Sequence, residues 1–134
     1  MKLLSFVVPC YNSQEYMRHC IDTLLAGGEK VEILIVNDGS CDHTADIANE
    51  YEKKYPSICR AIHQENKGHG GAVNTGIANA SGIYLKVVDS DDWVNRAAYD
   101  KIMETLSDFY DKGTVLDMLL AYYVYEKQGA KHKT

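Results

Sequence analysis

The sequence of 134 residues lacks several features that would assign it to a special class of protein. No apolar run approaches the roughly 20 residues that a membrane-spanning helix needs. The first residues, Met1 to Leu4, are soon followed by Pro9 and polar residues, which is not the pattern of a signal peptide. There is no basic stripe, and the net charge of −5 argues against nucleic acid as a partner. Internal repeats, low-complexity stretches and domain linkers are also missing.

The cysteines and histidines lack the spacings of metal or disulfide sites. The four cysteines form no Cys-x-x-Cys pair, and the five histidines show no paired metal spacing, which argues against a zinc site. Reduced thiols in a cytoplasmic protein are expected, with any membrane association coming from the rest of a longer protein. A hydrophobic content of 46% and a charged content of 25% are ordinary for one soluble globular domain. The composition leaves the oligomeric state open.

Apolar runs with the character of strands alternate with segments of helical periodicity. A cap at Asn12, with Glu15 three residues later, is expected to start the first helix. The predicted strands cover residues 4–8, 31–36, 59–63, 83–88 and 115–125, and the later helices cover residues 47–55, 69–80 and 98–106. Repeated β-α units predict an α/β fold with an open, mostly parallel, doubly wound sheet and helices on both faces. We expect one domain over residues 1–125, followed by a polar tail over residues 126–134.

Polar clusters follow three of the predicted strands. They are Pro9-Cys10-Tyr11-Asn12, Asn37-Asp38-Gly39-Ser40 and Asp89-Ser90-Asp91-Asp92. Each cluster taken alone is also typical of a turn. In parallel sheets, however, ligands bind beyond the carboxyl ends of the strands, so three clusters at one edge predict a shared binding site.

Asp89 and Asp91 are two residues apart at the end of a strand, where both can face one cation. Mg²⁺ and Mn²⁺ prefer such oxygen ligands and often bridge carboxylates to phosphate oxygens. Acidic turns and helix caps produce the same spacing, so the pair alone leaves both interpretations open.

A glycine-rich segment from Asn66 to Gly76 follows the third predicted strand. Its glycines allow the backbone to approach a ligand or a neighbouring element closely. It has neither the position and spacing of the dinucleotide fingerprint nor the Gly-Lys-Ser/Thr of a P-loop. His69 in this segment is interpreted as a polar cap of the following helix, with a ligand contact as the alternative.

Together, four segments resemble the large family 2 of inverting nucleotide-sugar glycosyltransferases, which has the GT-A fold. The segments are Val7 to Asn12, Ile35 to Ser40, Asn66-Lys67-Gly68 with Ala72-x-Asn74-x-Gly76, and Val88 to Trp93. They match in order over about residues 3–107. One departure is Asn37, where many relatives carry a second acidic residue.

The resemblance implies a nucleotide site whose contacts come from all of these segments. Asp38 would bind the base or the ribose, and the other implied contacts are Pro9, Tyr11, Asn12, Lys67, Gly68 and Asp89. Asp91 would be the principal metal ligand, with Asp89 near the metal or the ribose. Asp92 and Trp93 would support the loop.

The function implied by the resemblance is transfer of a sugar from a nucleoside diphosphate, with UDP favoured, to a glycan or lipid-linked acceptor. Cell-surface polysaccharide biosynthesis is the expected setting. A bound Mn²⁺ or Mg²⁺ would neutralise the departing diphosphate. No residue of this sequence matches the family's catalytic base for the acceptor hydroxyl, since Glu126 is the last acidic residue. That base is therefore expected beyond residue 134. The chain is therefore expected to be the donor-binding portion of a longer protein.

Three alternatives compete with this interpretation. The chain could be a catalytically silent module that binds nucleotide sugars. It could be a phosphohydrolase with Asp89 as nucleophile, although Asp92-Trp93 is a poor match to the Thr or Val expected there. A nucleotidyltransferase would carry a glycine-rich basic loop after the first strand, and Pro9 to Asn12 is not such a loop.

Overall fold

A computed structural model describes residues 2–111 and shows a four-stranded, all-parallel sheet with the strand order β3-β2-β1-β4. The strands are β1 (Leu4–Cys10), β2 (Val31–Asp38), β3 (Cys59–Gln64) and β4 (Tyr84–Val87). The helices are α1 (Met17–Leu24), the 3₁₀ helix η1 (Leu25–Lys30), α2 (Thr44–Lys54), α3 (Gly68–Asn79) and α4 (Arg96–Asp111). The α/β fold with a doubly wound parallel sheet is therefore confirmed. The strand expected over residues 115–125 and the tail over 126–134 lie outside the described residues.

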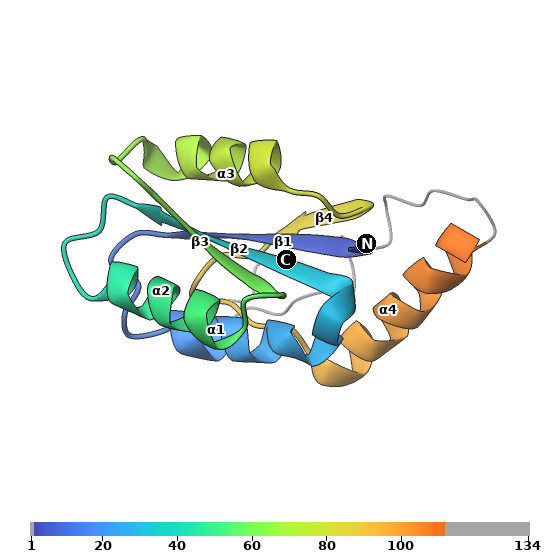
Figure 1. Cartoon of the computed structure of the whole chain (residues 1–134). Helices are drawn as coiled ribbons and strands as arrows, with labels where there is room; N and C mark the ends of the chain where they lie inside the picture. Colours follow the sequence, from blue (N-terminus) through green and yellow to red (C-terminus); the bar gives the residue numbers. More distant parts are fainter. Residues whose placement is uncertain (1, 112–134) are drawn as a thin grey trace, which may run out of the picture.

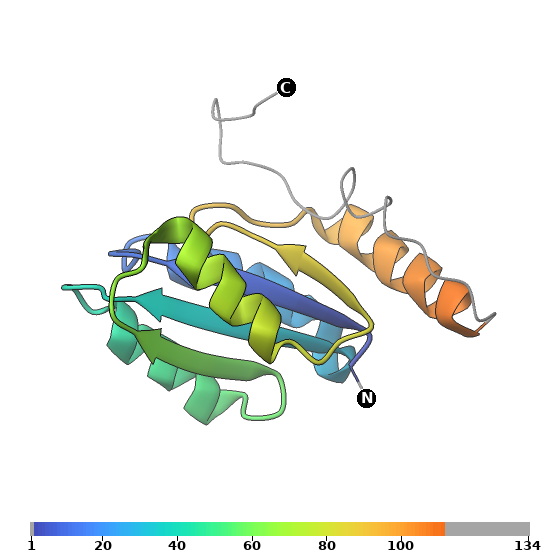
Figure 2. The same cartoon turned by 90° about the horizontal axis from the view of Figure 1, so that it is seen from above.

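Helices cover both faces of the sheet. In Figure 1, α3 lies on one face, while α1, α2 and α4 lie on the other. Figure 2 shows α3 from above, crossing the strands, all of which run in the same direction. With two covered faces, the central strands are expected to carry long apolar runs, such as Phe6 to Val8 in β1 and Ile33 to Val36 in β2.

Side chains of β1 alternate between two hydrophobic clusters. Phe6 and Val8 pack into the larger cluster, which includes residues of α1, α2 and α4. Val7 points to the opposite face and packs with Ala72 of α3. This period of two is the ordinary geometry of a strand, and it divides the core into a layer on each side of the sheet.

Gly76 lets α3 lie close against β1. A Cβ atom added at this residue would be 2.2 Å from Cγ1 of the buried Val7. No side chain larger than that of glycine fits without displacing the helix. The close packing in turn fixes the beginning of α3, which reaches the carboxyl edge of the sheet.

The predicted cap at Asn12 is wrong. Helix α1 begins at Met17 and has no side-chain cap hydrogen bond. Asn12 instead adopts a φ of 49°, its N–H donates to Ser40 Oγ at 2.9 Å, and its Oδ1 accepts from the Cys41 N–H at 2.8 Å. The residue joins the loop after β1 to the loop after β2.

Strand β3 lies at one end of the sheet order, and its outer side meets α2. The backbone N–H of Ala61 points away from β2 and donates to Oε1 of Glu52 at 2.6 Å. A side chain of α2 thus satisfies a backbone donor that would otherwise face outward at the edge of the described sheet.

Across residues 2–111, no helix is both long and apolar enough to cross a membrane.

Candidate functional site

The structure places the three polar clusters at one edge of the sheet. Strands β1 and β2 run in register to their ends, where Cys10 pairs with Asn37. Strand β4 ends beside β1, with Val87 opposite Val7. A side-chain hydrogen bond joins the loop after β1 to the loop after β4, where Ser13 Oγ lies 2.8 Å from Ser90 Oγ. The convergence that the sequence predicts is therefore present.

Two neighbouring cavities open at this edge and share Pro9, Tyr11 and His69 as walls. The cavity on the side of β2 has a volume of about 200 Å³ and is lined by Pro9, Cys10, Tyr11, Asp38, Asn66, Gly68, His69 and Ala72. The cavity on the side of β4 has a volume of about 330 Å³ and is lined by Pro9, Tyr11, Ser13, Tyr16, His69, Asp89, Ser90 and Asp91. Asp38 and the Asp89–Asp91 loop therefore line neighbouring cavities with a common wall.

Most of the predicted contact residues line these cavities. Pro9, Tyr11, Asp38, Gly68 and Asp89 do so, as does the predicted metal ligand, Asp91. Tyr11 exposes 55% of its surface, which leaves its ring free to stack on a flat ligand. Asn12 and Lys67 are not in either lining. The nucleotide and metal contacts predicted for all of these residues stay predictions.

Asp38 ends β2 and is buried. Its Oδ1 accepts hydrogen bonds from Gln64 Nε2 at 2.9 Å and from the Lys67 N–H at 2.7 Å. Burial acts to raise the pKa of this carboxyl, but the hydrogen bonds from Gln64, Lys67 and Gly68 outweigh it and hold the pKa below its ordinary value. Asp38 is thus an ionised group that fixes the start of the glycine-rich segment.

The turn after Asp38 packs directly on the segment after β3. Gly39 has a φ of 69°, and a Cβ there would be 2.6 Å from the Asn66 backbone nitrogen. Asn66 Nδ2 also donates to the carbonyl oxygen of Asp38 at 3.1 Å. Only glycine satisfies both the backbone conformation and the close contact.

The loop after β4 brings three carboxylates together. One carboxylate oxygen from each of Asp89, Asp91 and Asp92 lies within 4.8 Å of the others. The turn is closed by the Asp92 backbone N–H, which donates to the backbone carbonyl oxygen of Asp89 at 3.0 Å. Asp89 and Asp91 are half-buried, while Asp92 is buried. This donor set fits a hard divalent cation, and partly exposed ligands leave positions for phosphate oxygens. Asp92 is a third candidate metal ligand, whereas the family resemblance implies only that it supports the loop.

Trp93 anchors this loop to α1. Its ring lies 4.7 Å from the ring of His19 in an edge-on arrangement. The next residue, Val94, donates its N–H to Thr23 Oγ1 at 3.3 Å. These contacts agree with the supporting role expected of Trp93.

His69 lies between the two ends of the site. Its Nε2 is 3.8 Å from Asp89 Oδ1, and its side chain is 66% exposed. Helix α3 has no side-chain cap hydrogen bond, so the geometry favours a ligand contact over the cap interpretation. Gln64 and Asn66 belong to the site as well. The rule that ligands bind beyond the carboxyl ends of parallel strands could have predicted both residues, because they lie at or just after the end of β3.

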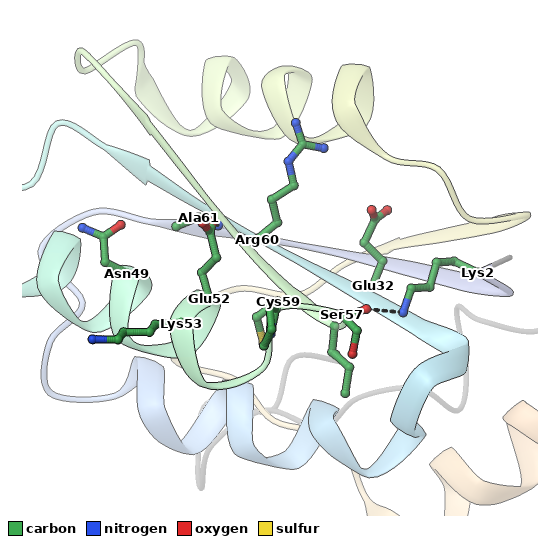
Figure 3. A pocket seen from close by; sticks show the side chains of 11 residues that line it. Lys2, Glu32, Asn49, Glu52, Lys53, Ser57, Cys59, Arg60 and Ala61 are labelled. Atoms are coloured by element: carbon green, nitrogen blue, oxygen red, sulfur yellow. Dashed lines mark hydrogen bonds between the residues drawn. The ribbon is translucent and has the colours of Figure 1, made fainter.

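A larger cavity, of about 800 Å³, lies elsewhere, around the beginning and the outer edge of β3 (Figure 3). Several of its charged side chains form hydrogen bonds within the chain. Lys2 donates to the Ser57 carbonyl, as Figure 3 shows, and Arg60 donates to Asn79. No cluster of carboxylates or histidines lies there among the described residues, so it offers less chemistry than the strand-end cavities.

Sequence comparison identifies the protein family. A model described as "Glycosyl transferase family 2" matches residues 5–130. The chain belongs to glycosyltransferase family 2. The predicted family 2 resemblance is thereby confirmed, and the four-stranded parallel sheet is the corresponding part of the GT-A fold.

Relatives of this family 2 chain are considerably longer. An uncharacterized glycosyltransferase, EpsJ of Bacillus subtilis, is 43% identical over 103 residues, which cover 76% of this chain and 30% of EpsJ. A putative glycosyltransferase of the same organism, EpsH, is 35% identical over 142 residues, with coverages of 96% and 41%. The chain thus spans less than half of either relative.

A solved structure has the same fold. TarS (residues 1–349) of Staphylococcus aureus, in complex with UDP-GlcNAc, superposes with a TM-score of 0.67 at 28% sequence identity. The match covers 84% of this chain and 32% of the TarS chain.

Proposed function

We propose that the chain is the donor-binding portion of a metal-dependent, inverting glycosyltransferase that transfers a sugar from UDP to a glycan or lipid-linked acceptor. The observation that carries this proposal is the pair of neighbouring cavities, with a buried carboxylate in one and an acidic cluster in the other. A nucleoside diphosphate has a matching polarity, with a flat base at one end and phosphates at the other.

The base and ribose belong in the cavity lined by Asp38 and Tyr11. A carboxylate has about four lone-pair sites, so the hydrogen bonds to Asp38 Oδ1 leave capacity for a donor on the base or ribose. The TarS complex with UDP-GlcNAc supports UDP as the nucleotide. A 29% identical relative named as a minor teichoic acid biosynthesis protein, GgaA of Bacillus subtilis, supports a cell-surface polysaccharide as the setting.

The diphosphate belongs in the cavity lined by Asp89 and Asp91. These carboxylates would hold Mn²⁺ or Mg²⁺, with Asp91 as the principal ligand, and the cation supplies positive charge to the departing diphosphate. His69, beside Asp89, lines both cavities. A base for the acceptor hydroxyl is assigned to none of the described residues.

Calorimetry with UDP tests the proposed site. Affinity in Mn²⁺ should exceed affinity in EDTA by at least about tenfold, equivalent to ~1.4 kcal/mol. Asp91→Ala should remove that difference without unfolding the chain, because Asp91 is on a partly exposed loop. Asp108→Ala removes the same charge from an exposed position on α4 and should leave the affinity difference between Mn²⁺ and EDTA unchanged. Equal affinity in Mn²⁺ and EDTA would refute the metal site.

Release of UDP separates a transferase from a silent binding module. A panel of UDP-sugars is incubated with the chain and Mn²⁺, and UDP is followed by an enzyme-coupled assay. Slow release to water that disappears in Asp91→Ala supports transfer chemistry. Tight binding with no release for any donor would favour the binding module.

A further inference from the structure

Three side chains from different elements form a hydrogen-bond relay at the end of β2. Asn37 Oδ1 accepts the Ser40 N–H at 3.2 Å, and Asn37 Nδ2 lies 3.0 Å from His63 Nδ1. On the other side of the ring, His63 Nε2 lies 2.7 Å from Asn49 Oδ1. The relay therefore joins β2, β3 and α2 beside Asp38.

The chemistry of these groups fixes the protonation of His63. A backbone N–H only donates, so the Asn37 oxygen must face Ser40 and the Asn37 amide nitrogen must face His63. That nitrogen also only donates, so His63 Nδ1 must accept and carries no proton. The ring proton is then on Nε2, where Asn49 Oδ1 accepts it. We infer that His63 is a positioning residue, held as the neutral Nε2–H tautomer, that orients Asn37 and the turn bearing Asp38.

The consequence for binding follows from burial and rests on the proposed function. Asn37 is 6% exposed, so its amide N–H has little access to water once the histidine acceptor is removed. Asn37 also holds the Ser40 N–H, and Ser40 in turn binds Asn12 in the loop after β1. Loss of the acceptor should loosen the turn around Asp38 and weaken UDP binding by about two- to tenfold, the range of one hydrogen bond.

Nitrogen NMR of the histidine rings tests the tautomer directly. Long-range ¹H–¹⁵N spectra distinguish protonated from unprotonated ring nitrogens, and the His63 signals are assigned by their absence in His63→Gln. The unmodified chain at neutral pH should show an unprotonated Nδ1 and a protonated Nε2. A proton on Nδ1 would overturn the inference.

Asn37→Asp provides a second test that needs no loss of packing. The new carboxylate accepts but cannot donate, so His63 Nδ1 should carry a proton in this variant and its nitrogen signal should change accordingly. An unchanged His63 spectrum in this variant would contradict the contact.

Binding data complete the test. His63→Phe, which has no acceptor, should weaken UDP binding by about two- to tenfold, whereas His63→Gln should stay within about twofold. His43→Phe, at an exposed histidine ahead of α2, is the control and should bind normally. Equal affinities for the two His63 variants would overturn the positioning role. Failure of the unmodified chain to bind UDP would refute the proposed function instead, and the NMR signals would still decide the relay.

Discussion

Substitution of Gly76 by alanine tests whether close packing of α3 on β1 supports the site. The added methyl would lie 2.2 Å from Val7 Cγ1, 2.9 Å from Cγ2 and 3.1 Å from Cβ. Val7 is fully buried and branched, and it packs beneath α3 with Ala72, so it has little room to move. The helix must therefore shift away from the sheet.

The expected magnitude is the difference between two opposing effects. Overpacking of a core costs about 1–3 kcal/mol, and three contacts this short place Gly76→Ala in the upper half of that range. Alanine is better than glycine inside a helix by about 1 kcal/mol, which offsets part of the cost. The net loss is about 1–2 kcal/mol, or a decrease of roughly 3–10 °C in Tm for a domain of this size.

Gly70→Ala is the matched control on the same helix. A Cβ at Gly70 meets nothing within 4 Å, so this variant should keep or slightly raise the melting temperature. Thermal unfolding followed by circular dichroism measures both variants, and UDP calorimetry shows whether displacement of α3 also weakens binding. Equal melting temperatures for Gly76→Ala and Gly70→Ala would refute the packing argument.

Further outcomes are expected at the site and in the core. His69→Ala should weaken UDP by about two- to tenfold but uridine much less, because His69 faces the acidic cluster; equal losses in calorimetry would place its contact on the base side. The pKa of Asp38 is lower in the folded chain, so its ionised form stabilises the fold above pH ~4, and that contribution is lost as the pH falls through the folded pKa. The urea midpoints of the unmodified chain and Asp38→Asn should therefore differ most near neutral pH and converge toward acid, and a gap independent of pH would contradict this. Burial raises the pKa of Cys10 and Cys59 to about 12, so a thiol reagent should label the exposed Cys41 first and the buried thiols only on unfolding; rapid native labelling of more than one thiol would contradict it.

The sheet and the location of the site could be predicted because they depend on strong local patterns. Continuous apolar runs such as Val31 to Val36 mark strands that are buried on both faces. Once those strands are parallel, their polar ends must meet at one edge, and the positions of Asp38 and Asp91 follow without any knowledge of contacts.

The roles of individual polar residues could not be predicted because their partners are distant in the sequence. Asn12 has the local pattern of a helix cap, but Ser40 and Cys41, which are 28 and 29 residues away, bind it instead. The partners of His63 are 26 and 14 residues away, on β2 and α2. Sequence spacing indicates which groups are able to pair locally, whereas the competition from groups on other elements is decided only by packing.

The hydrogen bond between Glu52 and Ala61 has a consequence for self-association. An edge strand with outward N–H groups is a template on which the strand of another molecule can add, and such additions lead to aggregates. Glu52 occupies one of these donors on β3 and also places a carboxylate beside the edge, where an incoming strand would have to bury it. The same contact that satisfies a backbone group within one molecule therefore disfavours growth of the sheet between molecules at this edge.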